Sequence, residues 1–527
     1  GTFNKQTKQF HFPENETKPG NIHELNANRL LFDRDDRLWI GFEDRLEVVD
    51  PFRQIFQHFS FPEELVEDPS FMFICNFNEL EEHIVVTGRG TNSVLYFDRA
   101  LSTYSQKQIM APNGFLVNNN WEVYAVNDQE WLFAQRNLPT VGLMQFNPSD
   151  PRPTIPAQFV PPTSETQGRV FRRMLQDNDG GLWVLQDDIL RFDLDQDTFV
   201  RYPNSLKAEL GDQYRFISSI FIDSKDQLWA GSEIGPRVFH RKDLTPIDIP
   251  SWTDVPIDGN EIRQFAEDRS GKIWIATAQR GLQVYDPTTQ SYRSLRMRDG
   301  LPSDQTYNIL VDRNGAIWVS TGGGLSRINT QTFEITSFTT QDGLKRNDLG
   351  YLWCNSMQQI STGEIFIGDF AGFTWFHPDR IPENEHPPTI VFTGFKVFDR
   401  PYQFGQNLNY LDRIKLTHDQ NFFQFEFAAL DFTNPDKNRY RYKLEGYDTE
   451  WRSAVVGQAS YTGIRGGHYT FRVRAANSHG VWNDQGIAIK VFVAPPFWQT
   501  WWFLALCIIS GLGLLALIYW SRIQTIK

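Results

Sequence analysis

The chain has 527 residues, of which 64 are Asp or Glu and 51 are Lys or Arg, so its formal net charge is −13 at pH 7. A surface with this acidic balance disfavours nucleic acid, and we expect no nucleic-acid partner. The 43 Phe, 17 Tyr and 16 Trp residues supply enough apolar area for a large packed core, which excludes a disordered chain.

The first 26 residues match only part of the repeat unit that follows them. Residues 1–4 and 9–12 correspond to its third and fourth strands, with no initiator Met and no signal peptide. We therefore expect residues 1–26 to be a partial blade of a truncated N-terminal region.

From residue 33 onward one pattern recurs, an Asp followed six positions later by a Trp. Its five copies are Asp33/Trp39, Asp177/Trp183, Asp223/Trp229, Asp268/Trp274 and Asp312/Trp318. Weaker copies at 83–86, 129–132 and 364–367 give a period of about 44 to 52 residues, which is typical of four-stranded propeller blades. We predict an all-β fold in which residues 27–380 form a β-propeller of seven or eight blades.

One repeat unit illustrates the expected strands. They cover residues 262–266, 272–277, 281–285 and 291–295. We expect each repeat Trp to pack between blades and each repeat Asp to accept backbone N–H bonds in a hairpin turn. Residues 177–181 begin like a calcium loop, but they lack the Glu at its twelfth position and the flanking helices, so we predict no metal site.

The three cysteines are far apart. Cys75 and Cys354 fall in widely separated repeats, and Cys507 lies in an apolar C-terminal segment. We therefore expect no disulfide framework, and stability should come from packing.

After residue 380 the repeat stops, and Pro382, Pro387 and Pro388 indicate a linker over residues 381–388. The strands that follow alternate apolar and polar residues with period two. The apolar positions are Phe423, Phe425 and Phe427; Tyr440, Tyr442 and Leu444; Tyr469, Phe471, Val473 and Ala475; and Ile487, Ile489, Val491 and Val493. Residues 389–495 are predicted to form a small antiparallel β-sandwich of the immunoglobulin or fibronectin kind.

Residues 497–520 form a predicted transmembrane helix. No residue between 491 and 521 is charged, and twenty mostly apolar positions are enough to span a hydrocarbon core of about 30 Å. Aromatic residues lie at both ends, and Arg522 and Lys527 follow as a positive-inside flank. We therefore place residues 1–496 in the periplasm, the single span in the inner membrane, and residues 521–527 at the start of a cytoplasmic connector.

Segments of the propeller region and of the sandwich resemble two known kinds of domain. Residues 267–277 and 312–321, each followed by Gly-Leu, resemble two-component regulator propeller repeats. Residues 440–448 and 467–475, with Trp451 and Tyr461, resemble the Y_Y_Y domain. The order of propeller, Y_Y_Y sandwich and membrane helix resembles the sensory half of membrane sensor kinases, notably hybrid two-component systems that detect glycans in the periplasm. In that family two propellers of about seven blades precede the sandwich, so the eight repeats imply a truncated N-terminal propeller or a single ring.

This resemblance implies a function in signal transduction. The chain would be the extracytoplasmic part of a homodimeric histidine kinase that detects a small molecule or oligosaccharide and relays the signal through sandwich and helix to a phosphorelay. The alternatives are the sensor region of a diguanylate cyclase or of a membrane-bound transcription regulator, a membrane-tethered binding or scaffold module, and a propeller lyase or hydrolase.

Catalysis within the chain receives little support. The ten histidines are scattered, with no HExxH pair, and neither a Gly-x-Ser-x-Gly elbow nor a phosphate loop occurs. We expect no catalytic residue and no cofactor. The ligand-binding residues stay unknown at this point, because the sequence does not show which loops converge at the mouth of the propeller.

Overall fold

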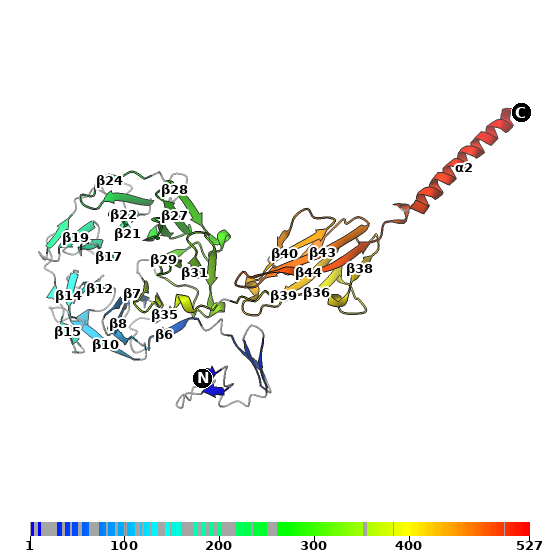
Figure 1. Cartoon of the computed structure of the whole chain (residues 1–527). Helices are drawn as coiled ribbons and strands as arrows, with labels where there is room; N and C mark the ends of the chain where they lie inside the picture. The colour runs from blue at the N-terminus through cyan, green and yellow to red at the C-terminus, as the bar shows by residue number, and fades with distance from the viewer. Residues whose placement is uncertain are drawn as a thin grey trace. The chain divides into compact units, whose positions relative to one another are not determined.

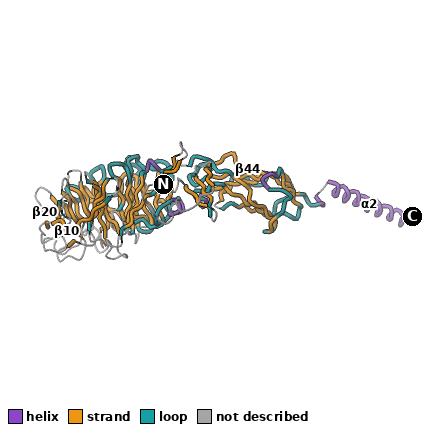
Figure 2. Tube along the Cα trace, turned by 90° about the horizontal axis from the view of Figure 1, so that it is seen from below, coloured by secondary structure: helices purple, strands orange, loops and turns teal. Residues whose placement is uncertain are grey.

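The structure is a computed structural model that describes most residues between 2 and 526. The longer segments outside the described residues are 12–28, 63–72, 111–115, 135–142, 160–172, 202–216, 250–260 and 351–355, and gaps of one to four residues occur elsewhere. The chain forms two compact units, one of Arg53–Ile381 and one of Gly1–Phe52 with Pro382–Lys527. Among the described residues, the regular secondary structure of both units is nearly all β-strand, apart from short 3₁₀ turns and a long helix at the C-terminus (Figure 2).

The unit Arg53–Ile381 contains seven sheets among its described residues, which are antiparallel except that β10 pairs with β15 in parallel (Figure 1). The first sheet has β7 (Phe73–Glu79), β8 (His83–Arg89), β9 (Val94–Asp98) and β10 (Tyr104–Met110), with β11 (Leu116–Val117) and β15 (Thr154–Pro156) added beside β10. The second has β12 (Trp121–Val126), β13 (Gln129–Ala134), β14 (Leu143–Phe146) and β16 (Gln158–Phe159). The third has β17 (Arg173–Gln176), β18 (Leu182–Leu185), β19 (Ile189–Asp193) and β20 (Thr198–Arg201).

The remaining four sheets have the same order of strands from the centre outward. The fourth has β21 (Ile217–Ile222), β22 (Gln227–Ser232), β23 (Gly235–His240) and β24 (Pro246–Ile247), and the fifth has β25 (Ile262–Glu267), β26 (Ile273–Thr277), β27 (Leu282–Asp286) and β28 (Ser291–Leu295). The sixth has β29 (Thr306–Val311), β30 (Ile317–Thr321), β31 (Gly324–Ile328) and β32 (Ile335–Phe338), and the seventh has β33 (Met357–Gln359), β34 (Ile365–Asp369), β35 (Gly372–Phe376) and β6 (Gln57–Ser60).

These sheets close into a ring. The innermost strands contact one another in the order β7, β12, β17, β21, β25, β29 and β33, and β33 contacts β7 again. The seventh sheet takes its outermost strand, β6, from the start of the unit, with Phe59 opposite Phe373. Because both ends of the ring segment share one sheet, backbone hydrogen bonds between β6 and β35 hold the ring closed. The ring is a propeller of seven blades.

The first Asp/Trp repeat lies outside this ring. Its strands β3 (Arg29–Phe32), β4 (Leu38–Gly41) and β5 (Leu46–Val49) form a separate three-stranded sheet in the other unit. The predicted propeller, residues 27–380, included this repeat, whereas the unit that contains the ring is Arg53–Ile381. Of residues 1–26, the described ones form a two-stranded sheet, β1 (Thr2–Asn4) with β2 (Gln9–His11).

The Asp/Trp spacing is explained by one hydrogen-bonded turn, which we call the Asp clasp. In the fifth blade one oxygen of Asp268 accepts the backbone N–H groups of Ser270 (2.8 Å) and Lys272 (3.1 Å), and the other accepts the indole N–H of Trp274 (2.8 Å). The same bonds recur at Asp177, Asp223 and Asp312. Each clasp ties the turn between the first two strands to a Trp on the second. The predicted role of the Asp in a hairpin turn is confirmed.

Four of the repeat indole rings pack between blades, as predicted, whereas Trp39 lies outside the ring and meets Phe432 of the sandwich. Trp183, Trp229, Trp274 and Trp318 are almost completely buried. Each belongs to a core cluster that contains residues of the next blade; Trp274, for example, packs with Ile309 and Ile317 of the sixth. Each of these Trp rings therefore packs against the next blade, while its indole N–H donates a hydrogen bond to the Asp of its own blade.

The expectation about cysteines is wrong at Cys75, which is disulfide-bonded. Cys507 is free, and Cys354 lies outside the described residues. The prediction failed because it treated distance along the sequence as distance in space. Ring closure places β33 and β34 of the seventh blade beside β7, the strand that carries Cys75.

The unit that includes Pro382–Lys527 contains two facing sheets. One is β37 (Arg400–Pro401), β36 (Ile390–Val397), β39 (Phe423–Ala429) and β42 (Gln458–Tyr461); the other is β38 (Arg413–Leu416), β44 (Trp482–Val493), β43 (Gly467–Ala476), β40 (Arg439–Glu445) and β41 (Arg452–Ala454). Buried residues alternate along β39 as the sequence predicted. The two sheets meet at Phe425 and Phe471, whose rings stack with centroids 3.9 Å apart. The result is a β-sandwich.

The three-stranded N-terminal sheet contacts this sandwich. The buried Arg37 guanidinium bonds Asp33 at 2.8 Å within its own repeat, donates to the Thr433 hydroxyl at 3.3 Å, and lies 3.9 Å from the Asp431 carboxylate. It also lies 5.6 Å from the centroid of the Phe432 ring. The Trp39 ring also meets the Phe432 ring edge to face, with centroids 6.3 Å apart. The displaced repeat thus contacts the sandwich through both Arg37 and Trp39.

The C-terminal helix α2 covers Trp501–Ile526. Within Trp501–Thr525 a window of 18 residues has a mean hydropathy of 2.3 and is not covered by other parts of the structure, so the helix is long and apolar enough to cross a membrane. The expected start at residue 497 differs from the structure, because Phe497–Gln499 forms a 3₁₀ turn before the helix. The helix also continues through Arg522 without a break.

Candidate functional site

The two faces of the propeller differ in chemistry. Because successive strands run in opposite directions, the Asp clasps all lie on one face, and the connections between blades lie on the other. We call the latter the connection face; it carries the first residues of each innermost strand and the segment 339–350 between the sixth and seventh blades. Loops on a rigid scaffold are where binding residues usually lie.

Ionisable groups gather on the connection face across the fifth and sixth blades. Arg263, near the start of β25, pairs with Glu261 at 2.9 Å, and both side chains are nearly buried, at 8% and 14% exposure. Burial lowers the pKa of Arg263, against the favourable charge of Glu261. Next to it, burial and the Asp348 carboxyl raise the pKa of Tyr307 to about 12. Partial desolvation also raises the pKa of Asp348, although that residue stays open to solvent.

Tyr307 fits closely against the chain on its other side. A Cβ atom on Gly350 would lie 2.4 Å from Cδ2 of the Tyr307 ring, which is far inside contact distance. Residue 350 therefore has to be a glycine while the ring holds this position. The phenol hydroxyl donates a hydrogen bond to Asp348, two residues earlier on the same connecting segment.

A second group of polar residues lies where the ring closes. Asp369 at the end of β34 is only 2% exposed, and burial raises its pKa to about 6 despite the nearby cations Lys345 and Arg346. The hydroxyl of Thr374 lies 3.5 Å from its carboxylate and 2.8 Å from Nδ1 of His58 on the closing strand β6. The other ring nitrogen of His58 is 3.1 Å from the Gly343 carbonyl. Burial lowers the pKa of His58, so the imidazole is neutral at pH 7.

Two aromatic rings, the buried Phe73 and the partly buried Phe370, lie near these charges. The Phe370 ring meets Phe73 of the first blade edge to face at 5.1 Å, and the Arg346 guanidinium lies 5.6 Å from the Phe370 centroid. The connection face thus gathers acids, cations, a phenol and a partly buried aromatic ring, side chains that can donate and accept hydrogen bonds and offer an apolar surface. Among the described residues no three His, Cys, Asp or Glu side chains are arranged to hold a metal ion.

The loop with the calcium-like start, Asp177–Gly181, has a different role. Both oxygens of Asp177 are used by the clasp, and Arg191 at 3.2 Å and Arg241 at 2.7 Å supply positive charge. The pKa of Asp177 is lowered by these partners, although burial opposes them. Two guanidinium groups at one carboxylate repel a cation, so this turn is structural.

Sequence analysis named no residue of this site. One signal was present: Ser218, Arg263 and Tyr307 each stand five residues before the Asp of a clasp. This position varies within an otherwise regular repeat, and in the fold it faces the connection side of the first strand. Asp348, Asp369 and Phe370 have no such periodic marker, because they depend on the irregular segment before β33 and on ring closure.

The comparisons with known proteins agree with this architecture. Residues 256–279 and 300–323 match the two-component regulator propeller, and residues 431–494 match the Y_Y_Y domain. Histidine kinase P4 of Formosa agariphila is 26% identical over 422 residues, which cover 77% of this chain but 30% of that protein. The chain therefore spans less than a third of that relative.

The fold also matches a solved structure. It superposes on an extracellular domain assigned to a hybrid two-component system of B. thetaiotaomicron with a TM-score of 0.68 and 17% identity, over 91% of this chain and 63% of that one. At this identity the likeness shows the fold alone. The chain is thus built from two-component regulator propeller repeats and a Y_Y_Y domain, followed by an apolar helix able to cross a membrane.

Proposed function

We propose that this chain is the extracytoplasmic sensor of a membrane histidine kinase of a two-component system, and that its ligand is a glycan or a related hydroxyl-rich nutrient. The observation that carries the proposal is chain order: the Y_Y_Y match ends at residue 494, and the apolar helix begins at Trp501. A folded domain joined to a single span by so short a connection is suited to passing a change of geometry across a membrane.

The topology follows from the helix flank. Arg522 lies at the C-terminal end of α2 and is the positive-inside residue, so the propeller and sandwich belong outside the cytoplasm and the C-terminus inside. The chain acts as a homodimer, since a kinase signal that crosses on single helices requires a change in how two of them sit together.

Signalling is a shift between two arrangements of the receptor. The ligand biases them only by the difference in its affinity for each, a coupling typically on the order of 1–3 kcal/mol. The connection face supports the ligand assignment, because Tyr307 and Asp348 offer a hydrogen-bond donor and an acceptor, and the partly buried Phe370 ring at the end of β34 offers an apolar surface on the same face.

A thermal-shift screen tests the ligand. The full chain in an uncharged detergent is heated with mono- and oligosaccharides; a sugar at a hundred times its dissociation constant adds about 2.7 kcal/mol of stability. We expect a raised melting temperature with one sugar class, no turnover of that sugar, and loss of the shift in Tyr307→Phe. The matched control is Tyr292→Phe, on the outermost strand of the fifth blade. Turnover, or a shift unchanged in Tyr307→Phe, contradicts the proposal.

The relay has its own test. A flexible Gly/Ser insertion after Val493, the last residue of β44, should leave ligand binding intact and abolish the response of the complete receptor. A response of normal size after the insertion would show that the signal does not pass through this connection.

A further inference from the structure

The outer face of the sandwich's five-stranded sheet is basic, although the chain as a whole is acidic. Its outward residues on β40 and β43 include four cations. In the register of the two strands Arg441 lies opposite Arg474, and Lys443 lies opposite Arg472. β38 and β44 add Arg413, Lys415 and Lys490. Arg472 and Arg474 are paired with Glu445 and Asp484, so the cations that remain for an anionic contact are those of β38 and β44.

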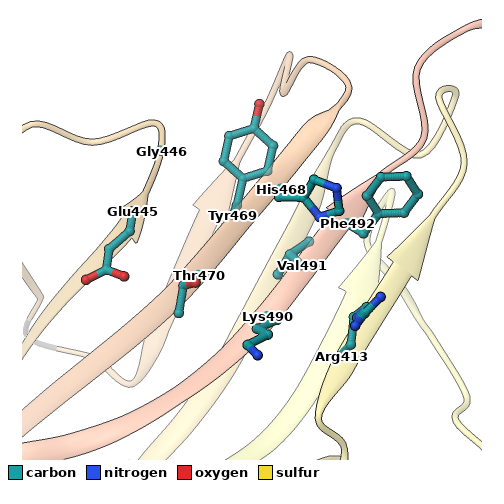
Figure 3. Close-up of a pocket in the computed structure, with 9 residues that line it drawn as sticks. All are labelled: Arg413, Glu445, Gly446, His468, Tyr469, Thr470, Lys490, Val491 and Phe492. Atoms are coloured by element: carbon teal, nitrogen blue, oxygen red, sulfur yellow. The ribbon is translucent and has the colours of Figure 1, made fainter.

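A pocket lies at one end of this face. It has a volume of about 520 Å³, within the range of small-molecule sites, and four of its residues form a row across four strands: Arg413, Lys490, Thr470 and Glu445 (Figure 3). His468 and Phe492 form the next row, with their rings 4.7 Å apart. The pocket thus combines a polar row with an aromatic edge.

The charges of this pocket are not balanced. Its one acid, Glu445, is already paired with Arg472 at 2.7 Å. Neither Arg413 nor Lys490 makes an ion pair with any residue that the structure describes, and the two stand directly opposite each other on adjacent parallel strands. Two neighbouring cations without a counter-ion attract an anion with several acceptor oxygens, such as a phosphate group.

Chain connectivity places the pocket at the membrane end of the sandwich. Lys490 and Phe492 belong to the last four residues of β44, and the seven residues 494–500 that lead to Trp501 can reach at most about 24 Å. Trp498 in this connection packs edge to face on His418, two residues after the end of β38, with ring centroids 5.6 Å apart. The strand ends that form the pocket are therefore those nearest the helix.

We propose that this pocket binds the phosphate headgroup of an anionic membrane lipid, with Arg413 and Lys490 on the phosphate and Phe492 toward the acyl region. The proposal goes beyond the sensing function and rests on α2 spanning a membrane. Bound lipid would fix the sandwich against the bilayer surface. A movement of the sandwich would then move the helix, and flexing of residues 494–500 would not take it up.

The test uses the full chain in uncharged detergent, with dihexanoyl phosphatidylglycerol as the probe and dihexanoyl phosphatidylcholine and inorganic phosphate as comparisons. Native mass spectrometry should show saturable binding of phosphatidylglycerol. Each of Arg413→Gln and Lys490→Gln should weaken it about fivefold, since a cation near a membrane surface contributes about 1 kcal/mol. The matched control is Arg439→Gln, which removes an exposed cation from the opposite end of β40 and should change nothing.

Three results would overturn the proposal: equal binding of phosphatidylcholine, equal weakening by Arg439→Gln, or affinity for inorganic phosphate as high as for phosphatidylglycerol, which would assign the pocket to a soluble anion. The melting temperature without lipid reports whether each variant folds. A photoreactive phosphatidylglycerol gives a second readout, which should label the peptide that contains residues 482–493 in the unsubstituted chain.

Discussion

Replacing Asp268 with Asn tests whether the Asp clasp holds the blades together. Asn keeps the size of the side chain and one carbonyl oxygen, which still accepts from the N–H groups of Ser270 and Lys272. Its NH₂ group, however, faces the indole N–H of Trp274, now 2.8 Å from a donor in place of an acceptor. A completely buried N–H is left without a partner.

The expected loss is about 2 kcal/mol. A bond to a charged acceptor contributes about 1.5–3 kcal/mol, and an unsatisfied buried donor costs about 1–3 kcal/mol. The ring has about 330 residues, so its melting entropy is about 0.7 kcal/mol per kelvin, and the change should lower the melting temperature by about 3 °C. Differential scanning of the full chain in detergent measures this.

A double-mutant cycle isolates the indole bond. Trp274→Phe removes the N–H, so Asp268→Asn should cost at least 1 kcal/mol less in that background. Asp286→Asn is the matched control, because Asp286 accepts backbone bonds in an outer turn and holds no Trp. Equal losses with and without Trp274 would refute the reasoning.

Three further changes probe the ring. Gly350→Ala should lower the melting temperature by several degrees, since its Cβ would meet the Tyr307 ring at 2.4 Å, and Tyr307→Ala should relieve the loss; a clash that persists in the double variant argues against this contact. The pKa of Asp369 in the folded chain, about 6, lies above its ordinary value of 3.8, so the free energy of unfolding should fall as pH rises from about 4 to about 6 and then level off. Asp369→Asn should therefore raise the stability at pH 7 by on the order of 2 kcal/mol. Melting temperatures of both proteins from pH 4 to 7 measure this, and an Asn variant no more stable than the unsubstituted chain at pH 7 would contradict it. Cys75→Ser should cost about 2–4 kcal/mol, measured by melting with and without a reductant, and a variant that still responds to the reductant would contradict the assignment.

Periodic features of this chain could be predicted from the sequence, because each depends on the spacing of residues within one short segment. The Asp and Trp of a clasp are six residues apart, and the alternation along β39 follows the two-residue period of a strand. Both appear in the structure as expected.

Features that depend on ring closure could not be predicted this way. The sequence left seven or eight blades open, because nothing local distinguishes the repeat of Trp39, which lies outside the ring, from that of Trp274, which lies in it. The bonded Cys75 was missed for the same reason. The connection-face groups Asp348 and Asp369 owe their positions to neighbours from other blades, so no pattern in their own segments identifies them.

The position of β6 at the start of the ring segment delays the completion of the seventh blade during synthesis. Its partner β35 lies about 310 residues further along the chain, which at about 5–20 residues per second is a delay of roughly 15–60 seconds. Throughout that interval β6 has no strand beside it and could join a neighbouring chain. Three of its four residues, Gln57, His58 and Ser60, are polar. An unpaired strand of this polar composition is a poor template for aggregation. The seventh blade can therefore be completed late without β6 first pairing with another chain.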